Sequence, residues 1–251
     1  MTSPLEGRTA LVTGASRGIG RAISLALAGA GARVAVVARD RQRLTTVCHE
    51  ISDLGSTALE LAGDITQSGV ADDLVRKSLE HWGQLDILVN CAGVVSSSDI
   101  LNLSETEWDR VMDTNIRALF LVTRAVGRHM VERQSGKIIN VASNFAFKGV
   151  ANHSVYSASK AAIVAFTRCA AIEWAPHNVQ VNAIAPGYIA TDLNADVRGD
   201  DEVAARITRT IPARRIGTPE ELGPWVVMLA SAASDYVTGE TIVIDGGLSA
   251  R

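Results

Sequence analysis

The stretch "TALVTGASRGIG", residues 9 to 20, decides the fold of this chain. Residues 9–14 are a short apolar run typical of a buried strand, and a helical pattern begins at residue 18. Gly14, Gly18 and Gly20 allow a tight turn and let a ligand approach the backbone. The first N–H groups of the helix and its dipole favour an anion such as a pyrophosphate. The segment therefore predicts a dinucleotide-binding unit of strand, turn and helix.

The rest of the chain repeats this alternation. Further strands are expected over residues 33–38, 85–90, 136–143, 179–187 and 240–247, with a weaker one within 56–64. Helices are expected over 18–30, 41–53, 67–82, 105–132, 155–175 and 219–231. The near-continuous apolar character of the strands suits a parallel sheet that is buried on both faces. We therefore predict a single α/β, doubly wound Rossmann-type domain over residues 1–251, with about seven strands and ligands at their C-terminal ends.

Composition excludes several classes of partner. The chain has 251 residues, 47% hydrophobic and 4% aromatic, with a net charge of −3, which gives no electrostatic case for nucleic acid or membranes. The start "MTSPLEGR" does not resemble a signal peptide, and no apolar stretch is long enough to span a bilayer. Cys48, Cys91 and Cys169 suggest neither a disulfide framework nor a metal site. We expect a soluble, cytoplasmic protein without a metal.

A second motif, "NHSVYSASKAAIV" at residues 152–164, places Tyr156 one helical turn before Lys160. Residues four apart share one face of a helix. On spacing alone, a tyrosine at the edge of the core and a solvated lysine are the better explanation, because any two residues meet such a pattern easily. The other motifs of the chain decide between this interpretation and a catalytic pair.

The glycine spacing Gly-x-x-x-Gly-x-Gly resembles that of the short-chain dehydrogenase/reductase family, and further motifs follow in the order of that family. They are "NCAG" (90–93), Asn115 in "DTNIRALF", Ser143, "YSASK" (156–160), "PGYIAT" (186–191) and the final "VTGETIVIDGG". The resemblance covers essentially the whole chain and is greatest to 3-oxoacyl-(acyl-carrier protein) reductases and gluconate 5-dehydrogenase-like polyol dehydrogenases. It implies an oxidoreductase that interconverts a carbonyl and a secondary alcohol by hydride transfer.

The resemblance assigns catalytic roles to Asn115, Ser143, Tyr156 and Lys160. Tyr156 would exchange a proton with the substrate oxygen, and Ser143 would polarise that oxygen. A free phenol titrates at about 10, and we expect the charge of Lys160 to lower this pKa. Lys160 would also hold the nicotinamide ribose. Asn115 would support Lys160 through a water molecule; a helix kink or a buried amide is the alternative at that position.

The resemblance also implies a set of cofactor contacts. They are Gly14, Ser16, Arg17, Gly18, Ile19, Gly20, Arg39, Asp64, Ile65, Asn90, Ala92, Gly93, Tyr156, Lys160, Pro186, Gly187, Ile189 and Thr191. Within this set, Asp64 would bind the adenine amino group, and Ile189 and Thr191 the carboxamide. Otherwise Asp64 is a loop or cap residue, and Pro-Gly an ordinary turn.

The cofactor is predicted to be NADP(H) rather than NAD(H). An acid at the end of the second strand would bind the ribose hydroxyls and select NAD, but Ala38 occupies that place. Arg39 and Arg17 could instead bind a 2′-phosphate through charge-assisted hydrogen bonds. The alternative is that both arginines are solvated and Asp40 serves as the ribose acid.

The substrate is less constrained. The charged segment 192–215 is expected to form a lid, or else a plain surface helix. A 3-oxoacyl thioester on acyl-carrier protein or CoA is the first choice; a sugar acid or polyol, or a broad range of ketones, is the alternative. Arg133, Lys137 and Arg168 could dock an acidic carrier or could be ordinary solvated charges. Gln134 and His177 stand where the acyl-carrier reductases tend to have arginines, which weakens the first choice.

Three further expectations remain. Ala158, Ala161, Ala162 and Ala165 form a small-residue face that suits a homotetramer, or packing within the chain. Cys91 and Asn144 depart from the family pattern, which more often has Asn and Ser there; Asn144 could tune the substrate pocket. A catalytically silent, nucleotide-sensing protein is the alternative from another class, because a fold does not fix a function.

Overall fold

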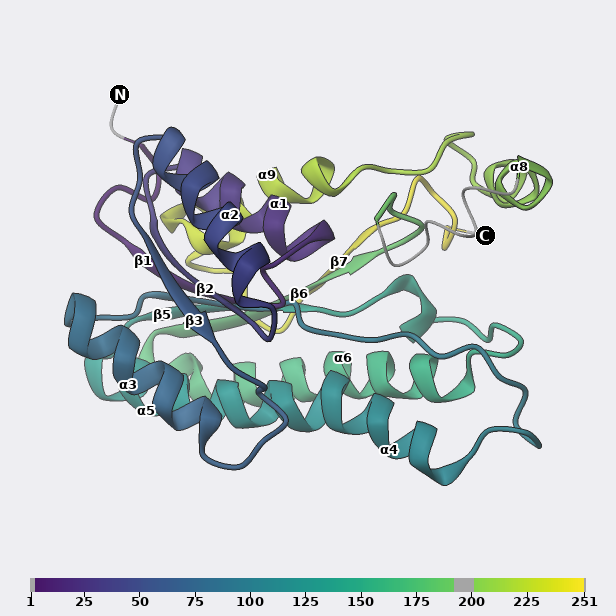
Figure 1. Cartoon of the computed structure of the whole chain (residues 1–251), viewed down its shortest axis with the longest axis horizontal. Coiled ribbons are helices and arrows are strands. Elements are labelled where there is room, and N and C mark those ends of the chain that lie inside the picture. The colour runs from purple at the N-terminus through teal and green to yellow at the C-terminus, as the bar shows by residue number, and fades with distance from the viewer. Residues whose placement is uncertain (1–2, 192–200, 251) are drawn as a thin grey trace.

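The computed structural model describes residues 3–191 and 201–250. Within these residues, seven strands form one parallel sheet in the order β3-β2-β1-β4-β5-β6-β7 (Figure 1). The strands are β1 (Thr9–Thr13), β2 (Arg33–Ala38), β3 (Ala58–Ala62), β4 (Ile87–Asn90), β5 (Gly136–Val141), β6 (Val179–Pro186) and β7 (Thr241–Ile244). The α/β, doubly wound parallel sheet predicted from the sequence is confirmed.

Helices cover both faces of the sheet (Figure 1). One face carries α1 (Gly18–Gly29), α2 (Arg41–Asp53) and α9 (Gly223–Ala230). The other carries α3 (Val70–Trp82), α5 (Ala118–Arg133) and α6 (Ser154–Trp174). Two shorter elements, α4 (Glu105–Met112) and α8 (Asp201–Thr210), lie at the right-hand end in Figure 1.

The strands are apolar on both sides because each side packs against helices. In β1, Ala10 and Val12 join the core under α1, α2 and α9, whereas Leu11 joins the core under α3, α5 and α6. Successive side chains of a strand point to opposite faces, so a strand between two helical layers must be apolar throughout. All five residues of β1 are buried. This explains the near-continuous apolar runs of the sequence.

The order of the strands reverses next to β1. The chain adds β2 and β3 on one side of β1 and then places β4 to β7 on the other. In sheets of this kind, the ends of the two strands at the reversal leave a crevice that binds ligands. Gly14 follows β1, and Cys91 follows β4, so both motifs that were predicted to bind a cofactor lie at this crevice.

Two predicted helices differ from the structure. The helix predicted over 105–132 is interrupted by a π-helical turn, Asp113–Arg117, between α4 and α5. A π-helical turn admits an extra residue and is often found at functional sites; here it contains the buried Asn115. The helix predicted over 219–231 begins as a 3₁₀ turn, Pro219–Leu222, with a capping box between Thr218 and Glu221, before α9.

The lid predicted over residues 192–215 lies partly outside the described residues. Residues 192–200 are not described, and α8 covers the next part of that range. Its last turns lead into residues 211–213, and the N–H of Ala213 donates to the carbonyl of Gly246, at 3.0 Å. None of the helices that the structure describes is long and apolar enough to cross a membrane.

Candidate active site

The glycine turn leaves no room for side chains at two positions. Gly14 has a φ of +68°, and a Cβ atom there would lie 2.8 Å from the Cα atom of Ala92. A Cβ atom on Gly20 would lie 2.2 Å from the carbonyl oxygen of Gly14. Ser16 and Ile19 lie in the same turn and are partly exposed. Among the described residues, no side chain caps the N-terminus of α1, so its N–H groups and dipole can receive an anion.

The segment after β4 forms the opposite wall of the crevice. Thr13 Oγ1 accepts hydrogen bonds from the backbone N–H groups of residues 91 and 92, at 3.1 and 3.2 Å. A Cβ atom on Gly93 would lie 3.4 Å from Oδ1 of Asn115 and 3.5 Å from Nζ of Lys160. The structure thus brings the glycine turn, the "NCAG" motif and two predicted catalytic side chains to one groove.

The segment after β6 lies beside the glycine turn. A Cβ atom on Gly18 would lie 3.3 Å from Cγ2 of Thr191. Gly187 packs on the C-terminal segment, because a Cβ atom there would lie 2.5 Å from Cβ of Asp245. Residues 186–191, which were predicted to contact the nicotinamide, are therefore next to the turn that was predicted to hold the phosphates. These close approaches and the uncapped N-terminus of α1 suit a dinucleotide whose pyrophosphate would lie against the glycine turn.

The adenosine end of the groove has two cationic side chains. Arg17 precedes α1, Arg39 follows β2, and both are exposed. In the part of the chain that the structure describes, neither guanidinium takes part in an ion pair. The carboxylate of Asp40 instead caps α2, accepting a hydrogen bond from the N–H of Arg43 at 3.1 Å. This cap competes with ribose binding and weighs against Asp40 as the ribose acid.

The loop after β3 is organised by Asp64. Its Oδ1 atom accepts hydrogen bonds from the N–H and Oγ1 groups of Thr66, at 3.1 and 2.8 Å. Arg117, in the π-helical turn, donates to the carbonyl of Thr66 at 3.0 Å. Ile65, which lies between Asp64 and Thr66 in the sequence, is buried. Asp64 is thus a turn residue, as its alternative interpretation held, and its Oδ1 atom is already engaged.

Asn90 is engaged inside the protein. Its Nδ2 group donates to Thr123 Oγ1 and to Asn140 Oδ1, each at 2.9 Å. Asn140 in turn donates to Thr167 at 2.9 Å. The side chain of Asn90 therefore ties β4 to β5 and α5, and a cofactor contact at this position would involve the backbone.

The four predicted catalytic residues lie near one another, beside the segments that follow β4 and β5. Tyr156 and Lys160 lie one turn apart at the start of α6, and Nζ of Lys160 is 5.7 Å from the centroid of the Tyr156 ring. Ser143, just after β5, shares a hydrogen bond with Tyr156. The solvated-lysine interpretation is wrong, because Lys160 is only 5% exposed.

Asn115 and Lys160 are both held by backbone groups. Asn115 accepts from the N–H of Val94 at 2.8 Å and donates to its carbonyl at 2.9 Å and to Ser159 Oγ at 3.0 Å. Nζ of Lys160 donates to the carbonyl of Val141 at 2.8 Å. Both the helix kink and the buried amide that the sequence left open at Asn115 are present. In the described structure, Asn115 fixes the loop after "NCAG" rather than bonding directly to Lys160.

Burial governs the ionisation of the site. Desolvation raises the pKa of Tyr156, and its hydrogen bond with Ser143 opposes this rise. Desolvation also lowers the pKa of Lys160 to about 8 and raises that of Cys91 to about 12. The expected lowering of the Tyr156 pKa is not found in the free protein, because the lost hydration of the phenolate outweighs the hydrogen bond with Ser143. A phenol that stays protonated suits a proton donor.

The pKa of Lys160 predicts a pH dependence. The lysine is charged below about 8 and loses its charge as the pH rises through that value. We expect kcat/KM for carbonyl reduction to fall above about pH 8, since this parameter reports groups of the free enzyme. Lys160→Arg keeps its charge, so the activity that remains in this variant should stay level to pH 9.5. A flat wild-type profile over the same range would contradict the assignment.

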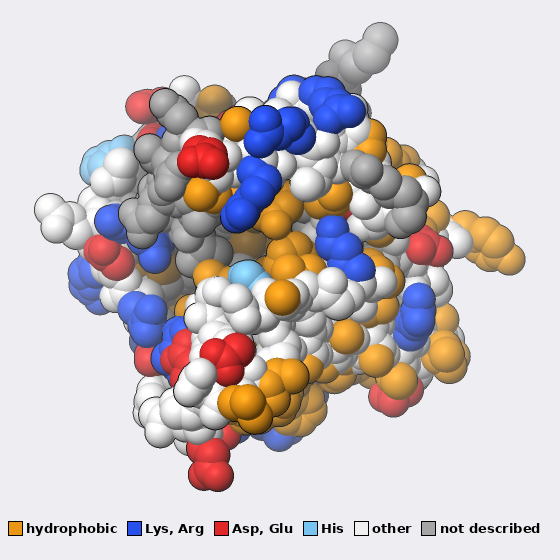
Figure 2. All heavy atoms as spheres, turned by 90° about the vertical axis from the view of Figure 1, so that its right-hand side faces the viewer, with side chains coloured by type: hydrophobic (Ala, Val, Ile, Leu, Met, Phe, Trp, Pro, Cys, Tyr) orange, Lys and Arg blue, Asp and Glu red, His pale blue; other side chains and the backbone are white. Residues whose placement is uncertain are grey.

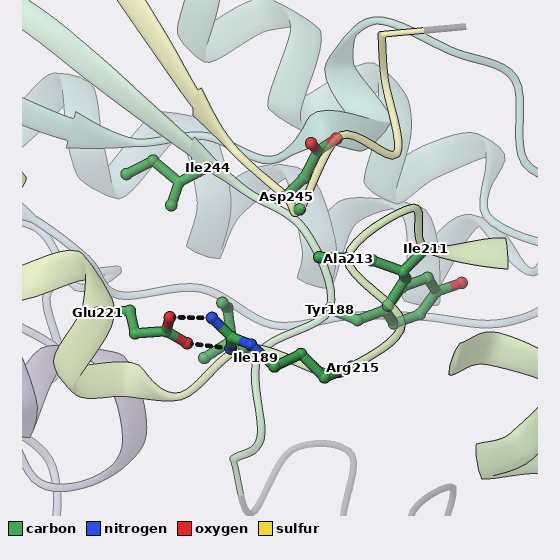
Figure 3. A pocket seen from close by; sticks show the side chains of 10 residues that line it. Tyr188, Ile189, Ile211, Ala213, Arg215, Glu221, Ile244 and Asp245 are labelled. Carbon is green, nitrogen blue, oxygen red and sulfur yellow. Dashed lines mark hydrogen bonds and ion pairs between the residues drawn. The ribbon is translucent and has the colours of Figure 1, made fainter. Parts of the chain in front are cut away.

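Asn144 has a different role from the one expected. It is 1% exposed, and its Nδ2 group donates to Asp245 Oδ2 at 3.2 Å. Asn144 therefore ties the loop after β5 to the C-terminal segment rather than lining the substrate pocket. Tyr188 and Ile189 lie beside that segment, around a small cavity that Arg215 and Glu221 border as an ion pair (Figure 3). Its volume, about 60 Å³, is too small for a dinucleotide.

Sequence reasoning missed three residues of the site. Thr13 receives the amides after β4, Ser159 supports Asn115, and the Phe145 N–H donates to Ser143 Oγ at 3.2 Å. Thr13 could have been found, because it stands at the strand end before Gly14. Ser159 and Phe145 carry no local signal, since their partners are brought close only by folding.

Comparisons with known proteins agree with this geometry. Residues 14–249 match the family described as enoyl-(acyl carrier protein) reductase. The chain is 41% identical over 248 residues to 2-dehydro-3-deoxy-D-gluconate 5-dehydrogenase of Escherichia coli K12, covering 98% of this chain and 97% of that protein. It is 38% identical over 249 residues to a 3-oxoacyl-[acyl-carrier-protein] reductase of Chlamydia pneumoniae, covering 99% and 100%.

A solved structure extends the comparison to a cofactor. A candidate NAD(P)-dependent gluconate 5-dehydrogenase of Beutenbergia cavernae, with NADP bound at low occupancy, superposes with a TM-score of 0.95. The two are 40% identical, and the match covers 100% of both chains. Similarity at this level places the protein among the nicotinamide-dependent oxidoreductases that act on CH–OH groups. It belongs to the short-chain dehydrogenase/reductase family, as its motifs predicted.

Proposed function

We propose that the protein interconverts a carbonyl and a secondary alcohol with NADP(H), through Ser143, Tyr156, Lys160 and Asn115. The bound nicotinamide supplies or accepts the hydride. Tyr156 gives its phenolic proton to the carbonyl oxygen as negative charge develops there, or takes a proton from the alcohol in the reverse direction. Ser143 donates a hydrogen bond to the same oxygen. Lys160 provides positive charge beside the phenol, and Asn115 holds the loop that follows β4 in place.

The preference for NADP(H) rests on Arg17 and Arg39. Both exposed guanidinium groups flank the crevice where the adenosine would lie, and Ala38 offers no carboxylate to the ribose. Guanidinium groups bind phosphate through two parallel hydrogen bonds, which gives both affinity and geometry. The capping role of Asp40 supports the same choice. The bound NADP of the Beutenbergia cavernae protein is consistent with it.

The substrate is proposed to be a small sugar acid or related hydroxy acid. The observation that carries this choice is the positive charge beside the catalytic loop: Nζ of Lys148 is 5.6 Å from the Phe145 ring centroid, and burial raises the pKa of Tyr188 while the charge of Arg206 opposes that rise. Figure 2 shows this end of the molecule, where Lys and Arg side chains gather beside a hollow with hydrophobic side chains. Cations there would favour a carboxylate.

A 3-oxoacyl thioester remains the second candidate. It was the first choice from the sequence, and the Chlamydia pneumoniae relative carries that name. However, two of the three basic residues that could dock an acidic carrier are paired. Arg133 lies 3.2 Å from the buried Asp86, and Lys137 lies 2.7 Å from Asp235. Both lie at the N-terminal end of β5, whereas Ser143 follows its C-terminal end.

The assembly and the lid are part of the proposal. Ala158, Ala161 and Ala165 are exposed along α6, which leaves the small-residue face open to a second copy of the chain, as a homotetramer would need. The segment 192–215 is proposed to cover the substrate, by resemblance to the family. Size measurement in solution tests the assembly.

The substrate choice predicts a clear difference between two carbonyls. Purified protein with NADPH should reduce 5-ketogluconate with a kcat/KM at least about ten times that for acetoacetyl-CoA, because about 1.4 kcal/mol of attraction between these cations and the carboxylate corresponds to a factor of ten. NADPH oxidation at 340 nm measures both rates. Turnover of acetoacetyl-CoA alone would restore the thioester as the substrate.

A further inference from the structure

Phe145 lies at the centre of an aromatic cluster beside the catalytic residues. Its ring centroid is 5.3 Å from that of His153, 5.9 Å from that of Tyr156 and 6.1 Å from that of Tyr188. All three contacts are edge-on, with interplanar angles of 80 to 88°. Nζ of Lys148 is 5.6 Å from the same centroid. One ring thus joins the loop after β5, the start of α6 and the segment after β6.

The backbone of Phe145 is fixed on both sides. Its N–H donates to Ser143 Oγ at 3.2 Å, which leaves the hydroxyl hydrogen of Ser143 to bond another group. The preceding residue, Asn144, is buried and bonded to Asp245. These two hydrogen bonds hold the short 3₁₀ turn Asn144–Ala146, which carries the Phe145 ring.

Tyr156 lies close to both the Phe145 ring and Lys160. Its ring meets the Phe145 ring edge-on at 5.9 Å and lies 5.7 Å from Nζ of Lys160. The other titratable group that acts on it is Cys91, after β4; His153 lies against the Phe145 ring. Edge-to-face aromatic pairs are favourable beyond the area they bury, so the contact favours one position of the Tyr156 ring.

We infer that Phe145 is a positioning residue for proton transfer, holding the Tyr156 phenol in line with Ser143 and Lys160 and limiting its access to water. This inference rests on the proposed function of Tyr156. Because Phe145 also touches Tyr188, it connects the segment that follows β6 to the proton donor. A misplacement of about 1 Å at a reacting group can cost about a hundredfold in rate, so a single aromatic contact has a measurable effect.

The kinetic test uses Phe145→Leu, which keeps an apolar side chain without the ring, and Phe145→Tyr, which keeps the ring. Phe147→Leu, two residues further on, is the control because Phe147 is 46% exposed. With NADPH and whichever of 5-ketogluconate and acetoacetyl-CoA is reduced faster, Phe145→Leu should lower kcat about tenfold and leave the KM for NADPH unchanged. Phe145→Tyr should restore kcat to within about threefold. An equal loss in Phe147→Leu, or a loss shared by NADPH binding and melting temperature, would show a merely structural role.

A second readout needs no substrate. The chain has three tyrosines, so the ionisation of Tyr156 can be obtained by ultraviolet titration as the difference from Tyr156→Phe. Phe145→Leu admits water and should lower the pKa of Tyr156 by at least about half a unit, whereas Phe147→Leu should not change it. An unchanged pKa in Phe145→Leu would overturn the inference. If neither carbonyl is reduced by the wild type but this shift is found, the proposed substrates fail and the positioning by Phe145 stands.

Discussion

Tyr156→Phe should lower kcat for NADPH-dependent carbonyl reduction by about a thousandfold. Positioned general acids contribute about 10² to 10⁴ in rate, and Phe has no proton to give. The ring of Tyr156 would still pack against Phe145, so NADPH affinity should change less than about twofold. Stopped-flow single turnovers, together with fluorescence titration of NADPH, measure the two quantities separately.

Tyr236→Phe is the matched control for this prediction. Tyr236 is fully exposed, so the same loss of a hydroxyl group there should leave kcat unchanged. If Tyr156→Phe retained more than a tenth of the wild-type kcat, Tyr156 would not be the proton donor. Tyr156 would then only line the site, and another acid would have to be sought.

Ala38→Asp combined with Arg39→Ala should reverse the cofactor preference. The change removes a guanidinium from the adenosine end and places a carboxylate where it would accept hydrogen bonds from ribose hydroxyls and repel a 2′-phosphate. Hydrogen bonds to charged groups contribute about 1.5–3 kcal/mol each, so NADPH should bind at least about a hundredfold more weakly. NADH should bind more tightly than it does to the wild type. Fluorescence titration with each cofactor gives both dissociation constants.

Arg128→Ala provides the control for the loss of positive charge. Arg128 is exposed on α5 and pairs with Asp72 of α3. Both helices lie on the face of the sheet opposite α1 and α2, so neither dissociation constant should change in Arg128→Ala. An equal loss of NADPH and NADH affinity in Ala38→Asp/Arg39→Ala would mean that the site does not distinguish the two cofactors by the 2′-phosphate. Asp40 would then have to be reconsidered as the ribose acid despite its capping bond.

The general layout of the site could be predicted from the sequence because its determinants are local. The period of apolar residues indicated buried strands, and Gly14 and Gly20 marked positions where the structure has no room for side chains. The four-residue spacing placed Tyr156 and Lys160 on one face of α6. Each of these inferences depends on residues within a few positions of one another.

The other features of the site could not be predicted from the sequence, because they depend on contacts between residues that only folding brings together. Asn115 lies in a π-helical turn, and its amide bonds to Val94, 21 residues earlier. Arg133 pairs with Asp86, 47 residues away, and so cannot be judged free or engaged from its neighbours in sequence. The pKa of Tyr156 depends on how deeply α6 packs, which spacing does not reveal. The aromatic cluster around Phe145 likewise draws on three separate segments.

The most direct test of the account follows the hydride itself. Purified protein would be given NADPH carrying deuterium at the transferable position of the nicotinamide, with 5-ketogluconate or acetoacetyl-CoA, and the products examined by mass spectrometry. The account predicts one deuterium in the alcohol product for each NADPH consumed, and none when Tyr156→Phe replaces the wild type over the same time. Tight NADPH binding with no deuterium transferred to either carbonyl would contradict it and would favour a protein that senses the nucleotide without catalysis.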